Sequence, residues 1–250
     1  AGWPSAILNG STFTYINYVN PPGGPHTWSN TQPNIIYGTN GANSIVKLDV
    51  SSGVTTTVKT FSQFTLVSYG EWEGNLSNDD RYMALQCRNG SSIHIVCYDM
   101  ATNVVVSTMN APIWPNNVTM SQSGNYVMVQ WDVSGTGNNQ GIWAYDRNTL
   151  NPVRNVSSSG GGHYDFGYDT QGNEVCVGTD IDNSSRGQYM IRIDNGVRTQ
   201  LLADSQMSWY IHVSCRNLNR PGWAYYTEFA DPNAETTKPN YQKIFAVKLD

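Results

Sequence analysis

Residues 77–99 read SNDDRYMALQCRNGSSIHIVCYD, and residues 121–146 read SQSGNYVMVQWDVSGTGNNQGIWAYD. Both stretches begin with a polar turn led by serine, continue as a strand that starts with tyrosine, and end in a second strand that stops at aspartate. The alternation in YVMV at residues 126–129 has a period of two, which is the period of a half-buried β-strand. The two stretches therefore predict one unit of antiparallel strands, used twice.

The same unit recurs along the whole chain. Its second strand ends in aspartate five times, with spacings of 50, 47, 48 and 56 residues, at Asp49, Asp99, Asp146, Asp194 and Asp250. A polar turn comes about twenty residues before each of these aspartates, and no window has a helical period. Four antiparallel strands in a unit of about 45–50 residues, repeated in phase, are typical of β-propeller blades.

We therefore predict an all-β fold, a β-propeller of four-stranded antiparallel blades with five recognisable repeats, either five-bladed or part of a seven-bladed propeller. The chain forms one domain, residues 1–250, and its blades lie at roughly 20–66, 67–110, 111–158, 159–205 and 206–250. Residues 1–19 are expected to supply closing strands, because a closed propeller joins its two ends and so removes free edges. The same pairing between neighbouring molecules would build a homo-oligomer or a filament by strand addition.

The composition indicates an extracellular protein. Only 13% of the residues are charged and the net charge is −5, while the chain has 8 Trp and 15 Tyr. An acidic chain with few cations is a poor partner for nucleic acid or anionic lipid, and no apolar run reaches the ~18–20 residues that span a membrane. The sequence begins at Ala1, which we interpret as the product of signal-peptide cleavage, with a shortened chain as the alternative.

The cysteines and the glycosylation sequons are both compatible with an extracellular location. Four cysteines allow three disulfide pairings, and buried free thiols are the alternative: Cys87, Cys97, Cys176 and Cys215. Six Asn-x-Ser/Thr sequons permit glycosylation, at Asn9, Asn75, Asn89, Asn117, Asn155 and Asn183. Chance alone predicts a similar number of sequons in a chain this rich in Asn, Ser and Thr.

The turn-and-strand pattern resembles that of the TolB-like propeller family of secreted bacterial proteins. The segments that carry the resemblance are EGNLSNDDRY at 73–82, GGHYDFGYDTQGNEV at 161–175 and HVSCRNLNRPGWAY at 212–225. Over residues 26–250 the chain is most similar to a poorly characterised extracellular branch of this family. The resemblance implies a propeller fold but no single activity, because TolB-like propellers serve as binding platforms, peptidase domains and polysaccharide lyases.

Polar residues that precede the repeated turns should converge near the propeller axis, because the first strand of each blade lines the central channel. Three of the four histidines occupy such positions, together with carboxylates of neighbouring blades. One interpretation is that these side chains satisfy backbone groups at the blade entries. The other is a site for a divalent cation, Ca²⁺, Mn²⁺ or Zn²⁺, formed by some of His26, Glu73, His163, Asp165 and His212.

Two enzymatic chemistries are compatible with these residues. A polysaccharide lyase needs a base and a group that neutralises the uronate carboxylate. His163 or His212 would be the base, Tyr164 the proton donor, and Arg216 or a metal the neutralising group. A glycosidase would instead use two carboxylates, Glu71 or Glu73 with Asp165.

We favour a non-catalytic role over these enzymes. A secreted propeller dense in Trp, Tyr and Asn is suited to recognising carbohydrate or a protein partner on its faces, because aromatic rings stack on sugars and amides reach hydroxyl groups. The predicted ligand-binding side chains are Trp28, Trp72, Trp114 and Trp209. The alternative for each is packing between blades. A polysaccharide lyase, or another polysaccharide-degrading enzyme, remains the second hypothesis.

Overall fold

The structure is a computed structural model of the chain. It describes residues 5–8, 15–19, 26–69, 74–131, 137–158, 164–180, 187–203, 213–215, 221–229 and 241–250. The single helical element in this part of the chain is a 3-10 turn, η1 (Gly137–Asn139), and every other regular element is a β-strand. No helix among these residues has the length and hydropathy needed to cross a membrane.

Four of the sheets have four antiparallel strands each, and their strands follow one another in sequence order. The first sheet consists of β3 (Thr27–Trp28), β4 (Ile35–Thr39), β5 (Ser44–Asp49) and β6 (Val54–Thr60). The second consists of β7 (Leu66–Ser68), β8 (Tyr82–Asn89), β9 (Ser92–Asp99) and β10 (Val104–Ala111). The third consists of β11 (Asn117–Met120), β12 (Tyr126–Gln130), β13 (Ile142–Asp146) and β14 (Pro152–Ser157). The fourth consists of β15 (Tyr164–Tyr168), β16 (Glu174–Asp180), β17 (Gly187–Arg192) and β18 (Arg198–Ala203).

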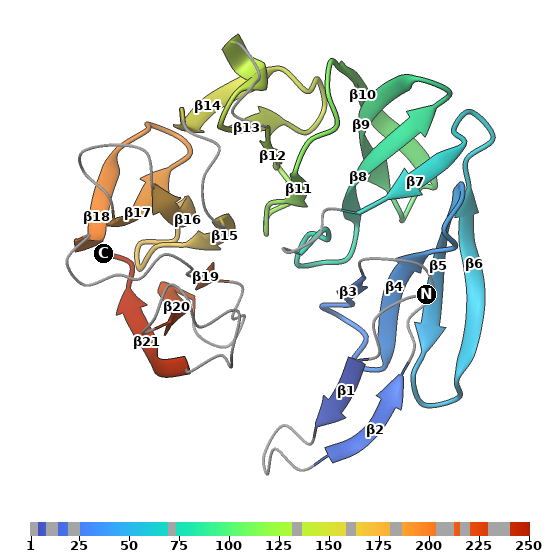
Figure 1. Cartoon of the computed structure of the whole chain (residues 1–250), viewed down its shortest axis with the longest axis horizontal. Coiled ribbons are helices and arrows are strands. Elements are labelled where there is room, and N and C mark those ends of the chain that lie inside the picture. The colour runs from blue at the N-terminus through green and yellow to red at the C-terminus, as the bar shows by residue number, and fades with distance from the viewer. Residues whose placement is uncertain are drawn as a thin grey trace.

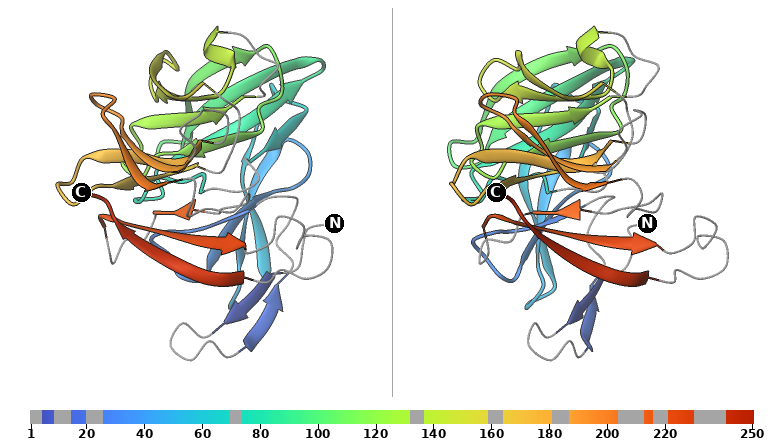
Figure 2. Two further views of the ribbon diagram at one scale, coloured as in Figure 1. Left: turned by 60° about the vertical axis from the view of Figure 1, so that its left-hand side comes forward. Right: turned by 90° about the vertical axis from the view of Figure 1, so that its left-hand side faces the viewer.

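The fifth sheet has three described strands, β19 (Val213–Ser214), β20 (Trp223–Phe229) and β21 (Tyr241–Lys248). Figure 1 shows the sheets arranged as an arc in which the first strand of each sheet lies toward the centre, and the side views in Figure 2 show successive sheets stacked face to face. The predicted all-β propeller of four-stranded antiparallel blades is confirmed, with about five blades. We number the blades 1 to 5 in this order.

Residues at the beginning of the chain form a separate pair of strands. β1 (Ser5–Leu8) and β2 (Tyr15–Val19) pair antiparallel with each other. Among the described strands neither pairs with β21, and the expectation that residues 1–19 supply closing strands stays a prediction.

The recurring serine and aspartate residues form the turns by accepting hydrogen bonds from the backbone. Ser77 Oγ accepts from Tyr82 N at 2.9 Å, and Ser121 Oγ accepts from Tyr126 N at 3.0 Å. Small polar side chains favour turns because they replace backbone partners in this way. The aspartate-led turn of each blade packs beside the serine-led turn, since Met100 N donates to the Arg81 carbonyl at 2.7 Å. We call this end of the blades the turn face, and the end where the first strands begin the entry face.

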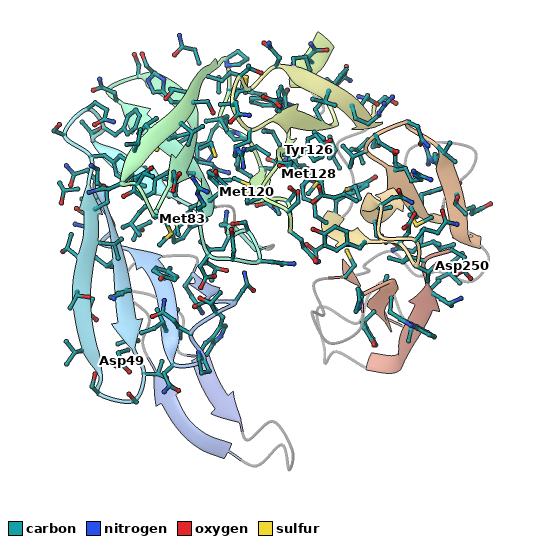
Figure 3. All side chains as sticks on the ribbon, turned by 180° about the vertical axis from the view of Figure 1, so that it is seen from behind. Asp49, Met83, Met120, Tyr126, Met128 and Asp250 are labelled. Carbon is teal, nitrogen blue, oxygen red and sulfur yellow. The ribbon has the colours of Figure 1, made fainter. Side chains whose placement is uncertain are left out.

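The hydrophobic core lies between the blades rather than inside them. Along β8, Met83 and Leu85 pack toward blade 1, whereas Ala84 between them packs toward blade 3. Separate clusters of this kind join blades 1 and 2, 2 and 3, 3 and 4, and 4 and 5. Figure 3 shows Met83, Met120 and Met128 in the inner part of the arc. Alternate residues of a strand therefore pack against the two neighbouring blades, as the stacked blades of a propeller require.

All four cysteines belong to these cores as buried free thiols. Burial raises the pKa of Cys97 to about 12 and also raises that of Cys87. Cys176 Sγ lies 3.4 Å from Met128 Sδ, across the junction of blades 3 and 4. Of the two alternatives for the cysteines, the structure shows packing and not disulfides.

Candidate functional site at the propeller axis and entry face

Asp80 joins blade 1 to blade 2 at the turn face. Its Oδ1 accepts from Asn30 N at 2.8 Å, and its Oδ2 accepts from Thr31 N at 3.1 Å and from Thr31 Oγ1 at 2.6 Å. Ser29 Oγ donates to the same carboxylate. Asp80 is 7% exposed and has a φ of 57°, a conformation that aspartate adopts more readily than most residues. The carboxylate of Asp80 therefore holds the turn at residues 29–31 of blade 1 against blade 2.

Gln122 connects four blades near the axis. Its Nε2 donates to the Phe166 carbonyl at 2.9 Å and to the Cys215 carbonyl at 3.0 Å, on the first strand of blade 4 and just after that of blade 5. Its Oε1 accepts from Asn78 Nδ2 of blade 2 at 3.2 Å. Gln122 is 4% exposed, so a ligand approaching the axis from the turn face would have to displace this network.

Asp165, one of the predicted metal ligands, has a structural role in the folded chain. It is 3% exposed, its Oδ1 accepts from Phe166 N at 2.9 Å, and its Oδ2 accepts from Cys215 N at 3.0 Å. Both carboxylate oxygens thus hold main-chain groups of blades 4 and 5. These contacts agree with the first of the two interpretations of the polar entry residues, and the use of Asp165 as a metal ligand or as a glycosidase carboxylate stays a prediction.

Of the other predicted metal ligands, the structure describes only His26. His26 is half-buried at the entry to β3. No group of three His, Cys, Asp or Glu side chains suited to a metal occurs in the described part of the chain. Several predicted site residues lie outside the described residues: Glu71, Trp72, Glu73, His163, Trp209, His212 and Arg216.

Tyr164, the predicted proton donor, is a core residue. It is 2% exposed and packs with Phe166 and Cys176 between blades 3 and 4. Its ring covers Gly178, where a Cβ atom would lie 2.0 Å from Tyr164 Cδ1. A polymeric substrate could not approach a ring held in this way, so the position of Tyr164 does not support the proton-donor role.

Two of the predicted glycan acceptors are also buried. Asn75 is 1% exposed and Asn117 is 2% exposed, and Asn75 Nδ2 donates to the Val118 carbonyl at 2.6 Å. Their burial is incompatible with a glycan in the folded chain. Asn89 and Asn155 are exposed, whereas Asn9 and Asn183 fall outside the described residues.

The two described tryptophans of the predicted ligand set lie at opposite ends of the blades. Trp28 directly precedes the turn at Ser29, whereas Trp114 comes before β11 at the entry face. The residues that correspond to Trp28 in blades 2 and 3, Leu76 and Met120, are buried between blades. Trp28 is 40% exposed because blade 1 is at one end of the arc. Trp28 belongs to none of the described inter-blade clusters, and the rings of Trp28 and Trp114 do not form one site.

Trp114 forms a pair with a residue that the sequence patterns did not indicate. The guanidinium carbon of Arg88 lies 4.9 Å from the centroid of the Trp114 ring. Arg88 is exposed and Trp114 is half-buried, and no carboxylate among the described residues pairs with Arg88. Nearby, Gln86 Nε2 donates to the Pro115 carbonyl at 3.4 Å and fixes the segment that follows Trp114. The sequence did contain one signal for Arg88. In the alternation of β8, Arg88 lies on the same side of the strand as Ala84, and that side faces blade 3.

Comparisons with solved structures agree with the fold. Oligogalacturonate lyase from Vibrio parahaemolyticus is similar with a TM-score of 0.60 at 11% identity, covering 99% of this chain and 69% of that chain. The β-propeller domain of the Trilobed protease from Pyrococcus furiosus gives 0.52 at 11% identity, covering 91% and 71%. TolB from Acinetobacter baumannii gives 0.50 at 14% identity, covering 98% of this chain and 59% of that chain.

The chain thus spans about three fifths of the length of that TolB chain. No protein-family model matches the sequence, and no curated protein sequence matches it. At such low identities the similarity shows the β-propeller fold and leaves activity to be argued from the residues themselves.

Proposed function

We propose that this chain is a secreted, non-catalytic binding propeller that recognises carbohydrate at the entry face, at the junction of blades 2 and 3. The observation that carries the proposal is the exposed Arg88–Trp114 pair. The apolar C–H face of a sugar stacks on the electron-rich face of an indole ring. The five N–H donors of a guanidinium can then bond to its hydroxyl or carboxylate oxygens.

The contact between Arg88 and Trp114 can be replaced by contacts with a ligand. An exposed cation–π contact contributes only about 0.5–1 kcal/mol, so Arg88 can leave the ring at low cost. Trp114 stays in place, because it is half-buried and the following Pro115 is held by Gln86. A rigid ring beside a movable donor binds a sugar with little loss of conformational entropy.

Substitution of Trp114 tests this function directly. Binding of neutral and acidic oligosaccharides would be measured by calorimetry on the wild type, on Trp114→Ala and on Trp28→Ala as the matched control. We expect Trp114→Ala to weaken binding at least about tenfold, taking as a guide the loss of about 1–3 kcal/mol when an aromatic ring that stacks on a nucleic-acid base is removed. Trp28→Ala should bind as the wild type does. Equal loss in both variants, or no binding by the wild type, would reject the proposal.

The accessibility of the glycosylation sequons can be tested separately. Expressed through a eukaryotic secretory pathway, the chain should gain glycans at Asn89 and Asn155 and none at Asn75 or Asn117, as judged by mass spectrometry of tryptic peptides. The structural reason is that only the first two side chains are exposed. Occupancy of Asn75 or Asn117 would show that modification precedes folding.

The second candidate function is polysaccharide lyase activity, with His163 or His212 as the base and Arg216 or a divalent cation as the neutralising group. The similarity in shape to oligogalacturonate lyase motivates the assay. The chain would be incubated with uronate polymers, with and without Ca²⁺ or Mn²⁺, and absorbance from new unsaturated ends would be followed. Metal analysis of the purified protein would test the cation site that includes His26 and Glu73. If neither measurement gives a signal, the lyase hypothesis is rejected and the binding role is the one that remains.

A further inference from the structure

We propose that β10, the outer strand of blade 2, is a docking edge for β10 of a second copy of this chain. The outer strand of each four-stranded blade presents unpaired N–H and C=O groups, and natural proteins protect such edges with charged residues or proline. β6 contains Lys59, β14 contains Pro152 and Arg154, and β18 contains Arg198. β10 reads VVVSTMNA and contains neither a charge nor a proline.

β10 is also the longest of these four outer strands, at eight residues against seven, six and six. It is held firmly from inside, because Val105 packs in the core toward blade 1 and Val106 and Met109 pack toward blade 3. Ser107 Oγ donates to the Arg147 carbonyl at 2.5 Å. A strand that is already ordered loses little conformational entropy when a partner adds to it.

The exposed side of β10 is compatible with its own copy. The register with β9 shifts between Val105 and Ser107 and is regular from Ser107 to Ala111. Antiparallel pairing of that regular stretch about Met109 places Ser107 opposite Ala111 and Thr108 opposite Asn110, so no like charges meet. The same operation on β6 or β18 would bring lysines or arginines close to the interface, where they repel. The neutral edge therefore favours a second copy as the partner.

Pairing of this kind is twofold and closed, so it gives a dimer with a continuous eight-stranded sheet and not a filament. Because the contact consists of one pair of edge strands, we expect it to bury less than the ~1,200 Å² of stable interfaces and to have a dissociation constant of about 0.1 mM. The inference rests on β10 and uses neither Arg88 nor Trp114, so it can fail while the proposed carbohydrate site holds.

Sedimentation across a concentration series tests the inference. The wild type should shift from monomer to dimer as its concentration rises, and amide exchange in 104–111 should slow. Thr108→Lys should weaken association at least about tenfold, because each copy then contributes a charge to the pairing edge. Asn110→Lys is a second variant with the same expectation. The matched control is Thr56→Lys on β6, which changes an exposed threonine of another outer strand and should leave association unchanged.

A wild type that remains monomeric up to about 1 mM, ten times the expected dissociation constant, overturns the inference. So does a dimer that Thr108→Lys and Thr56→Lys weaken equally, since the contact would then lie elsewhere. Circular dichroism of each variant shows that the fold is retained. If Thr108→Lys does not fold, Asn110→Lys decides the result.

Discussion

The junction of blades 2 and 3 has a cation–π pair at each of its two ends, and the two pairs differ in how they are held. At the turn face, the Arg147 guanidinium carbon is 3.9 Å from the centroid of the Tyr82 ring, and Arg147 Nη1 also donates to the Gly124 carbonyl at 3.0 Å. At the entry face, the Arg88–Trp114 distance is 4.9 Å and no hydrogen bond from the Arg88 guanidinium to a described residue accompanies it.

The same contrast separates Arg88 from the buried polar groups of the turn face. At the turn face, polar groups such as Asp80 and Gln122 are saturated by partners on neighbouring blades. At the entry face, Arg88 presents its donors to solvent. A saturated polar group contributes to stability, whereas an exposed donor next to an aromatic ring is available to a ligand. We therefore assign a role in folding to these turn-face residues, and the binding role that we propose rests on Arg88 at the entry face.

Asp80→Ala should give the largest loss of stability. The change removes the acceptor of four hydrogen bonds from Ser29, Asn30 and Thr31. Hydrogen bonds to a charged group contribute about 1.5–3 kcal/mol each but are not additive, so we expect a loss of about 3 kcal/mol in the free energy of unfolding. Urea denaturation measures it.

Asp194→Ala is the control for this change, because the Asp194 side chain is exposed and, among the described residues, accepts hydrogen bonds only from Arg192 and from its own turn. Its loss should stay below about 1 kcal/mol. Equal effects in the two variants would mean that the clamp between blades 1 and 2 contributes little to folding.

Gln122→Ala should have the next largest effect. It leaves the carbonyls of Phe166 and Cys215 without the donor that reaches them from blade 3. A buried polar group without a partner costs about 1–3 kcal/mol, and we expect a loss of about 2 kcal/mol by the same measurement. Gln171→Ala is the matched control, since Gln171 is exposed on the turn of blade 4. A Gln122 variant as stable as this control would show that the axis tolerates water in place of the amide.

The turn face is also the part of the molecule that the sequence predicts well. Ser77, Ser121 and Asp99 recur at fixed spacing, and each forms the turn that its residue type favours. The alternation of β8 and β12 likewise predicts the burial of Met83 and Val127. These features are local, so a repeat in the sequence becomes a repeat in the structure.

The entry face could not be predicted in the same way. Arg88 and Trp114 are 26 residues apart and belong to different blades, and only the packing of one blade on the next brings them together. Asp165 and Tyr164 show the same limit, because their residue types suggested chemistry and the structure places both in buried positions. Their burial and their backbone or core contacts depend on the neighbouring blades, which a single strand pattern does not contain.

A pair of arginine substitutions tests the comparison itself. Arg147→Ala should lower the free energy of unfolding by about 1–2 kcal/mol, because it loses the Tyr82 contact and the hydrogen bond to Gly124. Arg88→Ala should lower it by less than about 0.5 kcal/mol but weaken oligosaccharide binding. Thermal denaturation and calorimetry on both variants supply the two readouts. If Arg88→Ala proves the more destabilising change, the division of roles between the faces is wrong.

The smallest effect that we predict depends on pH and concerns Asp99, at the turn face of blade 2. Burial opposes its ionisation, but hydrogen bonds from Arg81 and from the backbone of Thr102 and Ala101 outweigh this, so the pKa of Asp99 lies below its ordinary value of 3.8. A carboxylate whose pKa is lower in the folded state stabilises the fold above the unfolded pKa, and this contribution is lost as the pH falls through the folded pKa.

Asp99→Asn keeps the acceptor oxygen and removes the charge, so it isolates this contribution. The difference in unfolding free energy between wild type and Asp99→Asn should be constant from pH 7 to about pH 5 and should shrink below about pH 4. Urea denaturation at several pH values measures it, with Asn89→Asp, at an exposed entry-face turn, as the comparison. The charge added there should change the acid limb of the stability curve little, because charge interactions at an exposed position contribute at most about 1 kcal/mol. A constant difference down to pH 3 would show that the Arg81–Asp99 ion pair adds nothing to the neutral hydrogen bonds of the turn.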